Sequence, residues 1–235
     1  MKKAIRTLRT RVGRVQREIE RKIDRIPETH QAQARDLLHR VNRIRTQKPK
    51  DKNKRYAVLA PEVECISKGK AHKPYEFGVK VSFATTLKEG IVVGARSMPG
   101  NPWDGHSLAE TLEQVGILTN RQPKTAIVDK GYQGVEIPNV RILRSGQRRG
   151  ITRTLKKMIK RRSAIEPTIG HMKTDGRLDR NPLKGALGDA LHAVLCGAGH
   201  NIRLLLKKLR LLCAEIRELI LALLYQSTQP LIPAR

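Results

Sequence analysis

The chain has 235 residues, with 48 Lys and Arg against 21 Asp and Glu, which gives a formal net charge of +27. This excess indicates a polyanionic partner, and the aromatic content of only 3% argues against a base-stacking platform for single strands. Cys65, Cys196 and Cys213 are scattered and lack CxxC spacing, which argues against a disulfide framework or a zinc site and suits a reducing cytosol.

The first 55 residues predict a basic helical hairpin followed by a polar linker. Residues 1–26 carry an apolar residue every three or four positions, as an amphipathic helix does. This stripe consists of Ile5, Leu8, Val12, Val15, Ile19, Ile23 and Ile26. Pro27 ends the first helix, residues 29–46 predict the second, and residues 47–55 form the linker. The segment holds 19 Lys and Arg against 6 Asp and Glu, so its charged face is either simply solvated or a surface that contacts phosphates.

Residues 56–184 predict a mixed α/β core, because strand patterns and helix patterns alternate along them. Strands are expected at residues 56–60, 75–86, 91–98, 125–128 and 140–145. Ser107 and Glu110 have capping-box spacing, which predicts a helix from Ser107 to about Val115. Asp104 and His106, just before this helix, are interpreted as loop and cap groups.

Residues 185–235 predict a leucine-rich helical tail, which Gly197 and Gly199 are expected to interrupt. Charged residues punctuate the tail, so it holds no apolar run long enough to span a membrane. A basic amphipathic helix could lie on a membrane surface. Packing against the core or against a second subunit is the favoured alternative, so a homodimer is one expectation and a membrane partner is not.

Two acids fall in positions suited to chemistry. Asp129 follows the apolar run 125–128, and an acid at the carboxyl end of such a strand projects into the crevice where α/β sheets place ligands. Glu166 shares one helical stripe with Arg162 and Lys173. Pro167 is expected either to kink this helix or to place Glu166 near its start. Paired carboxylates that bind divalent metals are a basis for phosphoryl transfer.

The motifs around these acids resemble a known family. Arg162, Glu166 and Lys173 have the spacing Arg-x3-Glu-x6-Lys, and VDKGY spans residues 128–132. With PGNPWDGHSLAETL at residues 99–112, the chain resembles bacterial insertion-sequence transposases of the DDE type, in the group with the signature Tyr-x2-Arg-x3-Glu-x6-Lys. It departs from this signature at the Tyr position, where Ile159 stands. The resemblance covers essentially the whole chain.

The resemblance implies a ribonuclease-H-like core, two Mg²⁺ or Mn²⁺ ions, and cleavage and transfer of DNA strands in transposition. Asp129 and Glu166 would be the catalytic acids and metal ligands. The residues expected to bind DNA are Arg162, Lys173, Lys130 and Arg161. The partners would be double-stranded DNA of the element ends and target, in the bacterial cytosol near the nucleoid.

The resemblance also implies a first catalytic Asp on the central first strand, before a helical insertion that residues 1–55 resemble. No Asp before Tyr75 lies on a predicted strand, so the chain is expected to lack that strand, as if truncated at its amino terminus, and to be inactive alone. The acids that could substitute are Glu62, Glu64, Glu76 and Asp104. Two alternatives stay open, a catalytically dead DNA-binding remnant of a decayed element and a ribosomal or RNA-binding module.

Overall fold

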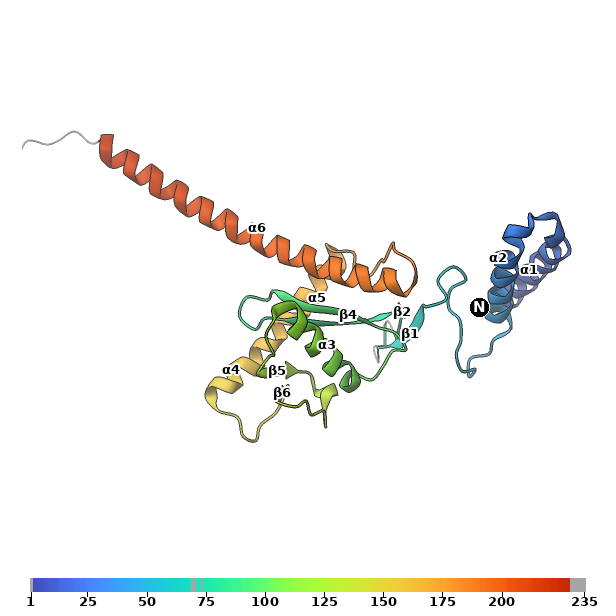
Figure 1. Cartoon of the computed structure of the whole chain (residues 1–235), viewed down its shortest axis with the longest axis horizontal. Helices are drawn as coiled ribbons and strands as arrows, with labels where there is room; N and C mark the ends of the chain where they lie inside the picture. Colours follow the sequence, from blue (N-terminus) through green and yellow to red (C-terminus); the bar gives the residue numbers. More distant parts are fainter. Residues whose placement is uncertain (1, 69–70, 73, 229–235) are drawn as a thin grey trace, which may run out of the picture. The chain divides into compact units, whose positions relative to one another are not determined.

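The computed structural model describes residues 2–68, 71–72 and 74–228, which form a mixed α/β structure (Figure 1). The helices are α1 (Lys2–Arg21), α2 (Glu28–Thr46), α3 (Asp104–Thr119), α4 (Arg153–Arg161), α5 (Ile165–Thr174) and α6 (Gly185–Thr228), with 3-10 turns η1 (Ile23–Arg25), η2 (Lys130–Tyr132) and η3 (Arg162–Ala164). The strands are β1 (Glu64–Ser67), β2 (Tyr75–Gly78), β3 (Lys80–Thr85), β4 (Val92–Met98), β5 (Thr125–Val128) and β6 (Arg141–Arg144).

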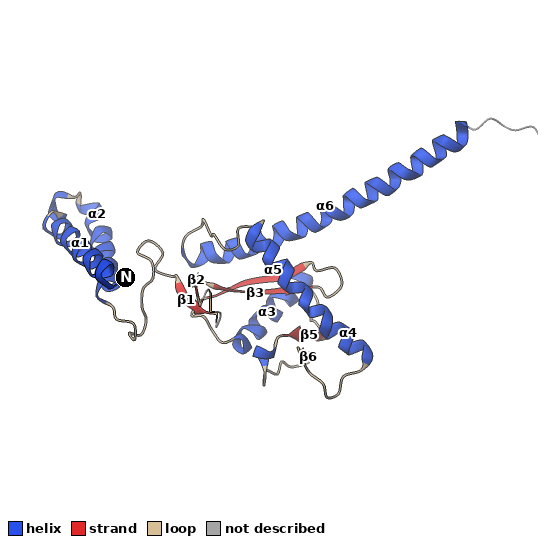
Figure 2. Cartoon of the chain, turned by 180° about the vertical axis from the view of Figure 1, so that it is seen from behind, coloured by secondary structure: helices blue, strands red, loops and turns tan. Residues whose placement is uncertain are grey.

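The chain divides into two compact units. The first contains Met1–Val81, Ser97–Trp103 and Pro182–Ala190. The second contains Ser82–Arg96, Asp104–Asn181 and Leu191–Arg235. The strands are short, and within the described residues they pair only two by two, as β1–β2, β3–β4 and β5–β6 (Figure 2).

The predicted helical hairpin is present in the first unit, but Ile23 is the one stripe residue that it buries fully among the described residues. Gly13 and Gln16 are the buried residues of α1. A Cβ on Gly13 would lie 3.1 Å from Nη1 of Arg45 on α2, so the missing side chain makes room for that guanidinium. Leu8 is 62% exposed, and the stripe residues Ile5, Val15 and Ile19 are exposed as well. Periodicity therefore predicted the helix correctly and its buried face wrongly.

The strand predicted at residues 56–60 is wrong. This segment pairs with no strand among the described residues. Instead, the ring centroids of Tyr56 and Phe77 lie 5.4 Å apart, and Val58 O accepts a hydrogen bond from the Arg40 side chain at 3.3 Å. The ladder begins later, where β1 pairs antiparallel with β2. The predicted strand 75–86 is also divided, into β2 and β3, because Gly78 has a φ of 145°, which side chains disfavour.

Two amide side chains bind the backbone of β4 in the second unit. Asn201 on α6 accepts from Val92 N at 2.7 Å and donates to Val92 O at 2.8 Å. Gln114 on α3 accepts from Ala95 N at 2.9 Å and donates to Ala95 O at 3.2 Å. Each amide therefore satisfies a strand residue as a neighbouring strand would.

Strands β5 and β6 run parallel, with Thr125 opposite Arg141 and Val128 opposite Arg144. Leu108 and Leu112 of α3 pack with Ala126 and Val128 of β5 in a buried cluster. Helix α3 begins at Asp104, three residues earlier than predicted. The Ser107 hydroxyl donates to Asp104 O at 2.8 Å inside the first turn, so the predicted capping box is absent.

Helices α5 and α6 both contain residues that disfavour a helix interior, a proline in α5 and glycines in α6. Pro167 lies in the first turn of α5, where its missing N–H costs little, so Glu166 sits near the helix start. Gly197 and Gly199 do not interrupt α6, which is continuous over 44 residues. A Cβ on Gly197 would lie 2.9 Å from Val92 Cγ1, so this glycine allows close packing of the helix on β4.

We expect Asn201→Ala to lower the free energy of unfolding by about 1–3 kcal/mol, because Val92 would keep a partly buried N–H and C=O without their partners. Chemical denaturation measures this loss. The control is Glu218→Ala on the same helix, whose exposed ion pair with Arg217 is worth at most about 1 kcal/mol. Equal losses in the two variants would contradict the structural role of Asn201.

Candidate active site

Asp129 is presented by the end of a strand. It follows β5 directly and caps η2, where its Oδ1 accepts from the Lys130 backbone N–H at 2.7 Å. This bond fixes one carboxylate oxygen and leaves the other, Oδ2, for a further contact. The side chain is 53% exposed, so solvent and substrate can reach it.

Glu166 is presented by the first turn of α5, where an acidic side chain also complements the helix dipole. Helix α4, which Thr152 caps by accepting from Leu155 N at 3.3 Å, leads through η3 into α5. Ile169 of α5 packs against the buried cluster of Val92, Ala95 and Met172. Ile169 therefore anchors the helix that carries Glu166 to the core.

The Arg162 guanidinium joins the two acids. Its Nη2 lies 3.3 Å from Asp129 Oδ2, and its Nη1 lies 3.4 Å from Glu166 Oε1. The Arg162 side chain is only 21% exposed, against 71% for Glu166. A strand end and a helix start, 37 positions apart in the sequence, thus converge on one planar cation.

The other cations predicted to bind DNA have different surroundings. Arg161 donates to Leu87 O at 2.7 Å and to Lys88 O at 2.5 Å, so its guanidinium holds the loop after β3. A Cβ on Gly146 would lie 2.9 Å from Cε of Lys130, so Lys130 extends along the turn after β6. Lys173 is half-buried in the last turn of α5.

Asp104 and Tyr132 are additional residues of the site. A Cβ on Gly131 would lie 3.1 Å from Asp104 Oδ2, so glycine in the DKGY motif lets Asp104 approach. Burial raises the pKa of the Tyr132 phenol, and the negative charges of Asp104 and Asp129 act in the same direction, against a Ser107 hydrogen bond and the Arg162 charge. From the sequence, Asp104 is expected to be a loop or cap group and is one of four acids that could substitute for the missing Asp, and only the VDKGY motif points to Tyr132.

The remaining acids considered as substitutes are held elsewhere. Glu62 accepts from Gly185 N at 2.8 Å, and Glu64 accepts from Gly100 N at 2.6 Å. Glu76 forms an ion pair with Lys68 at 2.9 Å. Asp104 is therefore the candidate that the structure places beside the turn of Asp129.

A cavity of about 660 Å³ lies between β3 and β5 in the second unit. Its wall includes every residue from Ser82 to Gly90 and every residue from Thr125 to Asp129, together with Arg162. Alternate side chains of a strand point to opposite faces, so consecutive lining residues mean that the cavity meets the strand edges. On these edges β3 and β5 have no described strand as a neighbour.

The two carboxylates are the right type of ligand for a divalent metal, but they are too few to hold one among the described residues. Asp129 and Glu166 offer hard oxygen donors, which Mg²⁺ and Mn²⁺ prefer, and they already share a cation. Among the described residues, however, no group of three or more His, Cys, Asp or Glu could hold a metal ion. The pair is therefore a partial ligand set.

Helix α4, which leads through η3 to Glu166, carries a basic face. Its exposed residues Arg153, Lys156, Lys157 and Lys160 are spaced i, i+3, i+4 and i+7, which places them on one side of the helix. The opposite side holds the half-buried Leu155, Met158 and Ile159 and continues to Arg162. The basic face and Arg162 therefore lie on opposite sides of this segment, although Lys160 and Arg162 are only two positions apart in the chain.

Comparison with known proteins gave one finding. Residues 42–202, about two thirds of the chain, match the family described as "Transposase DDE domain". Searches of curated proteins and of solved structures gave no significant match. Within the described part of the chain, no helix is long and apolar enough to cross a membrane.

We expect the difference in absorbance titration between the unchanged chain and Tyr132→Phe to have its midpoint above the ordinary tyrosine pKa of 10.0. A raised folded-state pKa means that the contribution of Tyr132 to stability is complete below pH 10.0 and is lost as the pH rises through the folded-state pKa. Asp104→Asn should lower the midpoint and Arg162→Gln should raise it. A midpoint insensitive to both changes would contradict the described surroundings of Tyr132.

Proposed function

Because the chain belongs to the transposase DDE domain family, whose members act in DNA transposition, we propose that it comes from a transposase of a bacterial insertion sequence and that Asp129 and Glu166 are two of its metal-binding acids. The observation that carries this proposal is the joint contact of both acids with Arg162, at 3.3 and 3.4 Å. One cationic group between two carboxylates marks a place where positive charge is favoured.

Members of this family use divalent metal ions, and Mg²⁺ or Mn²⁺ held by Asp129 and Glu166 would supply an activated oxygen nucleophile and stabilise the leaving oxygen. The residues of this chain contribute the rest. Arg162, with its planar fork, is suited to hold a phosphate oxygen near the two acids. Lys130 and Lys173 would contribute point charges for the DNA backbone, and Arg161 would position the loop at Leu87.

We further propose a ribonuclease-H-like arrangement in which the cavity between β3 and β5 accepts another strand, which carries the third acid. Support comes from the two strand edges that line the cavity and from Asp129 and Arg162 on its wall. Unpaired strand edges are templates for a further strand. Residues 56–184 would then form the catalytic core, with residues 1–55 as an insertion and residues 185–235 as an appended helix.

The second candidate function is a DNA-binding remnant without catalysis. It is favoured by the incomplete ligand set among the described residues, and Arg162 already offsets part of the charge of the two acids. Both candidates keep DNA as the partner, so binding and catalysis need separate tests.

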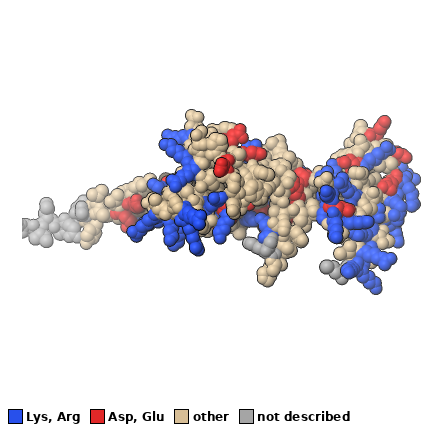
Figure 3. Space-filling model, turned by 90° about the horizontal axis from the view of Figure 1, so that it is seen from below, with Lys and Arg blue, Asp and Glu red and all other residues tan. Residues whose placement is uncertain are grey.

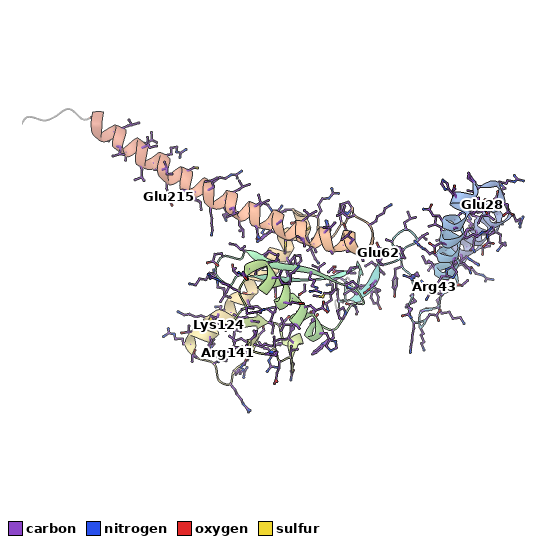
Figure 4. The ribbon with its side chains drawn as sticks, viewed as in Figure 1. Glu28, Arg43, Glu62, Lys124, Arg141 and Glu215 are labelled. Atoms are coloured by element: carbon purple, nitrogen blue, oxygen red, sulfur yellow. The ribbon has the colours of Figure 1, made fainter. Side chains whose placement is uncertain are left out.

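Double-stranded DNA is the proposed partner in both cases. Figure 3 shows Lys and Arg gathered over the α1–α2 hairpin, and further Lys and Arg side chains form the basic face of α4. Lys124 and Arg141 are labelled in Figure 4. Lys124 precedes β5 and Arg141 begins β6, at the end of the strands away from Asp129, and Arg141 N donates to Lys124 O at 2.9 Å. The basic face of α4 is the surface nearest the acids in sequence, so we propose that it holds the DNA backbone.

We expect binding to duplex DNA that weakens steeply with salt, with a log–log slope of about −0.9 for each neutralised phosphate. The double variant Lys156→Ala and Lys157→Ala should make the slope shallower by about 0.9 per lost contact. The matched control, Lys207→Ala with Arg210→Ala, removes the same charge from α6 and should leave the slope nearly unchanged. A slope that responds equally to both pairs would contradict the role of α4, and binding to single strands alone would contradict the choice of duplex DNA.

We expect the chain alone, with Mg²⁺ or Mn²⁺, not to join a pre-cut element end to target DNA. With two acids in place of three the reacting groups are not held in line, and misplacement by about 1 Å can cost about 10²-fold in rate. The assay is strand transfer, with Asp129→Ala as the control. Turnover that Asp129→Ala abolishes would disprove the need for a third acid while it supports the transposase assignment.

The proposed strand can be tested without catalysis. A peptide of alternating apolar residues that ends in Asp should slow hydrogen exchange at residues 82–85 and 125–128, and the same peptide ending in Asn should do so equally. Restored strand transfer with the Asp peptide alone would favour the transposase over the remnant. Unchanged exchange at both strand edges would contradict the proposed strand position.

A further inference from the structure

The distal part of α6 exposes a long apolar surface. Every described side chain from Leu205 to Tyr225 is exposed, although leucine and isoleucine dominate this stretch. A helix of 44 residues is about 66 Å long at 1.5 Å per residue. Exposed apolar surface of this extent marks a site of interaction, and helices gain most of their stability from packing of an apolar face.

The exposed apolar residues follow a heptad repeat. They are spaced alternately three and four positions apart, and they are Ile202, Leu205, Leu209, Leu212, Ile216, Leu219 and Leu223, between 46% and 66% exposed. Ile202, Leu209, Ile216 and Leu223 fall at heptad position a, and the other three leucines at position d. Such a repeat is typical of one strand of a coiled coil. We call the row of these seven residues the heptad seam.

We propose that the heptad seam pairs with the heptad seam of a second copy of this chain, antiparallel, so that α6 forms a two-helix dimer contact. In an antiparallel pair, a positions of one helix face d positions of the other. Placing Leu209 against Leu212 of the second copy also places Ile202 against Leu219 and Leu205 against Ile216. Six residues of each helix then enter the contact.

Charge selects this direction and register. Positions g of the seam are Lys208, Glu215 and Ala222, and g positions face each other across an antiparallel pair. In the register above, Lys208 of each chain lies opposite Glu215 of the other. A shift by one heptad would set Glu215 against Glu215. A parallel pair would instead set these charges against the apolar e positions, Cys213 and Ile220, and gain no ion pair. Figure 4 labels Glu215 on this part of the helix.

The second copy of α6 fits better than the exposed stripe of α1, which has a similar spacing. Residues 2–21 carry eight Lys and Arg against two Glu, and residues 205–225 carry four against two. Both segments are therefore positive, and their pairing would juxtapose like charges. The α6 pair also carries net positive charge, but it offsets part of it with two Lys208–Glu215 contacts.

Analytical ultracentrifugation of the full chain tests the dimer, and we expect twice the mass of one chain. Leu212→Asp, at the centre of the seam, should shift the mass to that of one chain. The matched control is Leu211→Asp, because Leu211 is 58% exposed, next to Leu212 at 51%, and points away from the seam at position c. A monomer for the unchanged chain, or equal effects of the two substitutions, would overturn the proposal.

Disulfide formation tests the direction without depending on the stability of the Asp variants. In a chain with its three cysteines replaced, Lys208→Cys and Glu215→Cys are made singly. Mixing the two variants should give a cross-linked dimer under mild oxidation, and neither alone should do so. Cross-linking of a Leu209→Cys variant with itself, in preference to the mixture, would indicate a parallel pair and overturn the antiparallel arrangement. Loss of the dimer on removal of residues 1–26 would assign the seam to α1 and overturn the choice of partner.

Discussion

The contact of Arg162 with Asp129 and Glu166 is the interaction on which the candidate site depends. Two carboxylates brought near each other repel, and here a guanidinium with low exposure offsets that repulsion through two separate nitrogens. The three residues come from a strand end, a 3-10 turn and a helix start. Their meeting therefore requires that β5 and the α4–α5 segment hold fixed positions. Arg161 contributes to this by binding the backbone at Leu87 and Lys88.

The strands around the site are short, and side chains from helices replace part of the missing sheet. Asn201 and Gln114 use both ends of their amides to satisfy Val92 and Ala95. Strands β3 and β5 instead leave one edge each on the cavity. Backbone groups of β4 therefore have hydrogen-bond partners on α3 and α6, while the edge of β5 faces a space that another strand could fill.

The sequence predicted the local placement of the candidate site residues better than the contacts that surround each of them. Local spacing was sufficient for the shared face of Arg162 and Glu166 and for Asp129 at a strand end. It also predicted the positions of α2, β4, β5 and β6 to within a few residues. Spacing could not show that Arg161 would bind a loop 73 positions away, or that Asp104 would approach Gly131, because both depend on tertiary contacts.

Two other errors have the same origin. The stripe of α1 was expected to be its buried face, yet Gly13 and Gln16 are the buried residues of α1, and the small size of Gly13 makes room for Arg45 of α2. Gly197 was expected to interrupt α6, yet the close approach of Val92 makes a glycine favourable there. In each case the effect of the glycine comes from the neighbouring side chain that can pack close to it, and not from the low helix propensity of glycine.

The proposed pairing of α6 beyond Leu204 would link the order of the helix to the amount of protein present. A segment whose described apolar side chains are all exposed gains little from its own chain, so its helical content would depend on encounters with a partner. Its melting temperature would then rise with protein concentration, while the cluster around Val92 and Met172 would melt independently of it. The chain would in this way respond to its own abundance, with an ordered helix only when many copies are present.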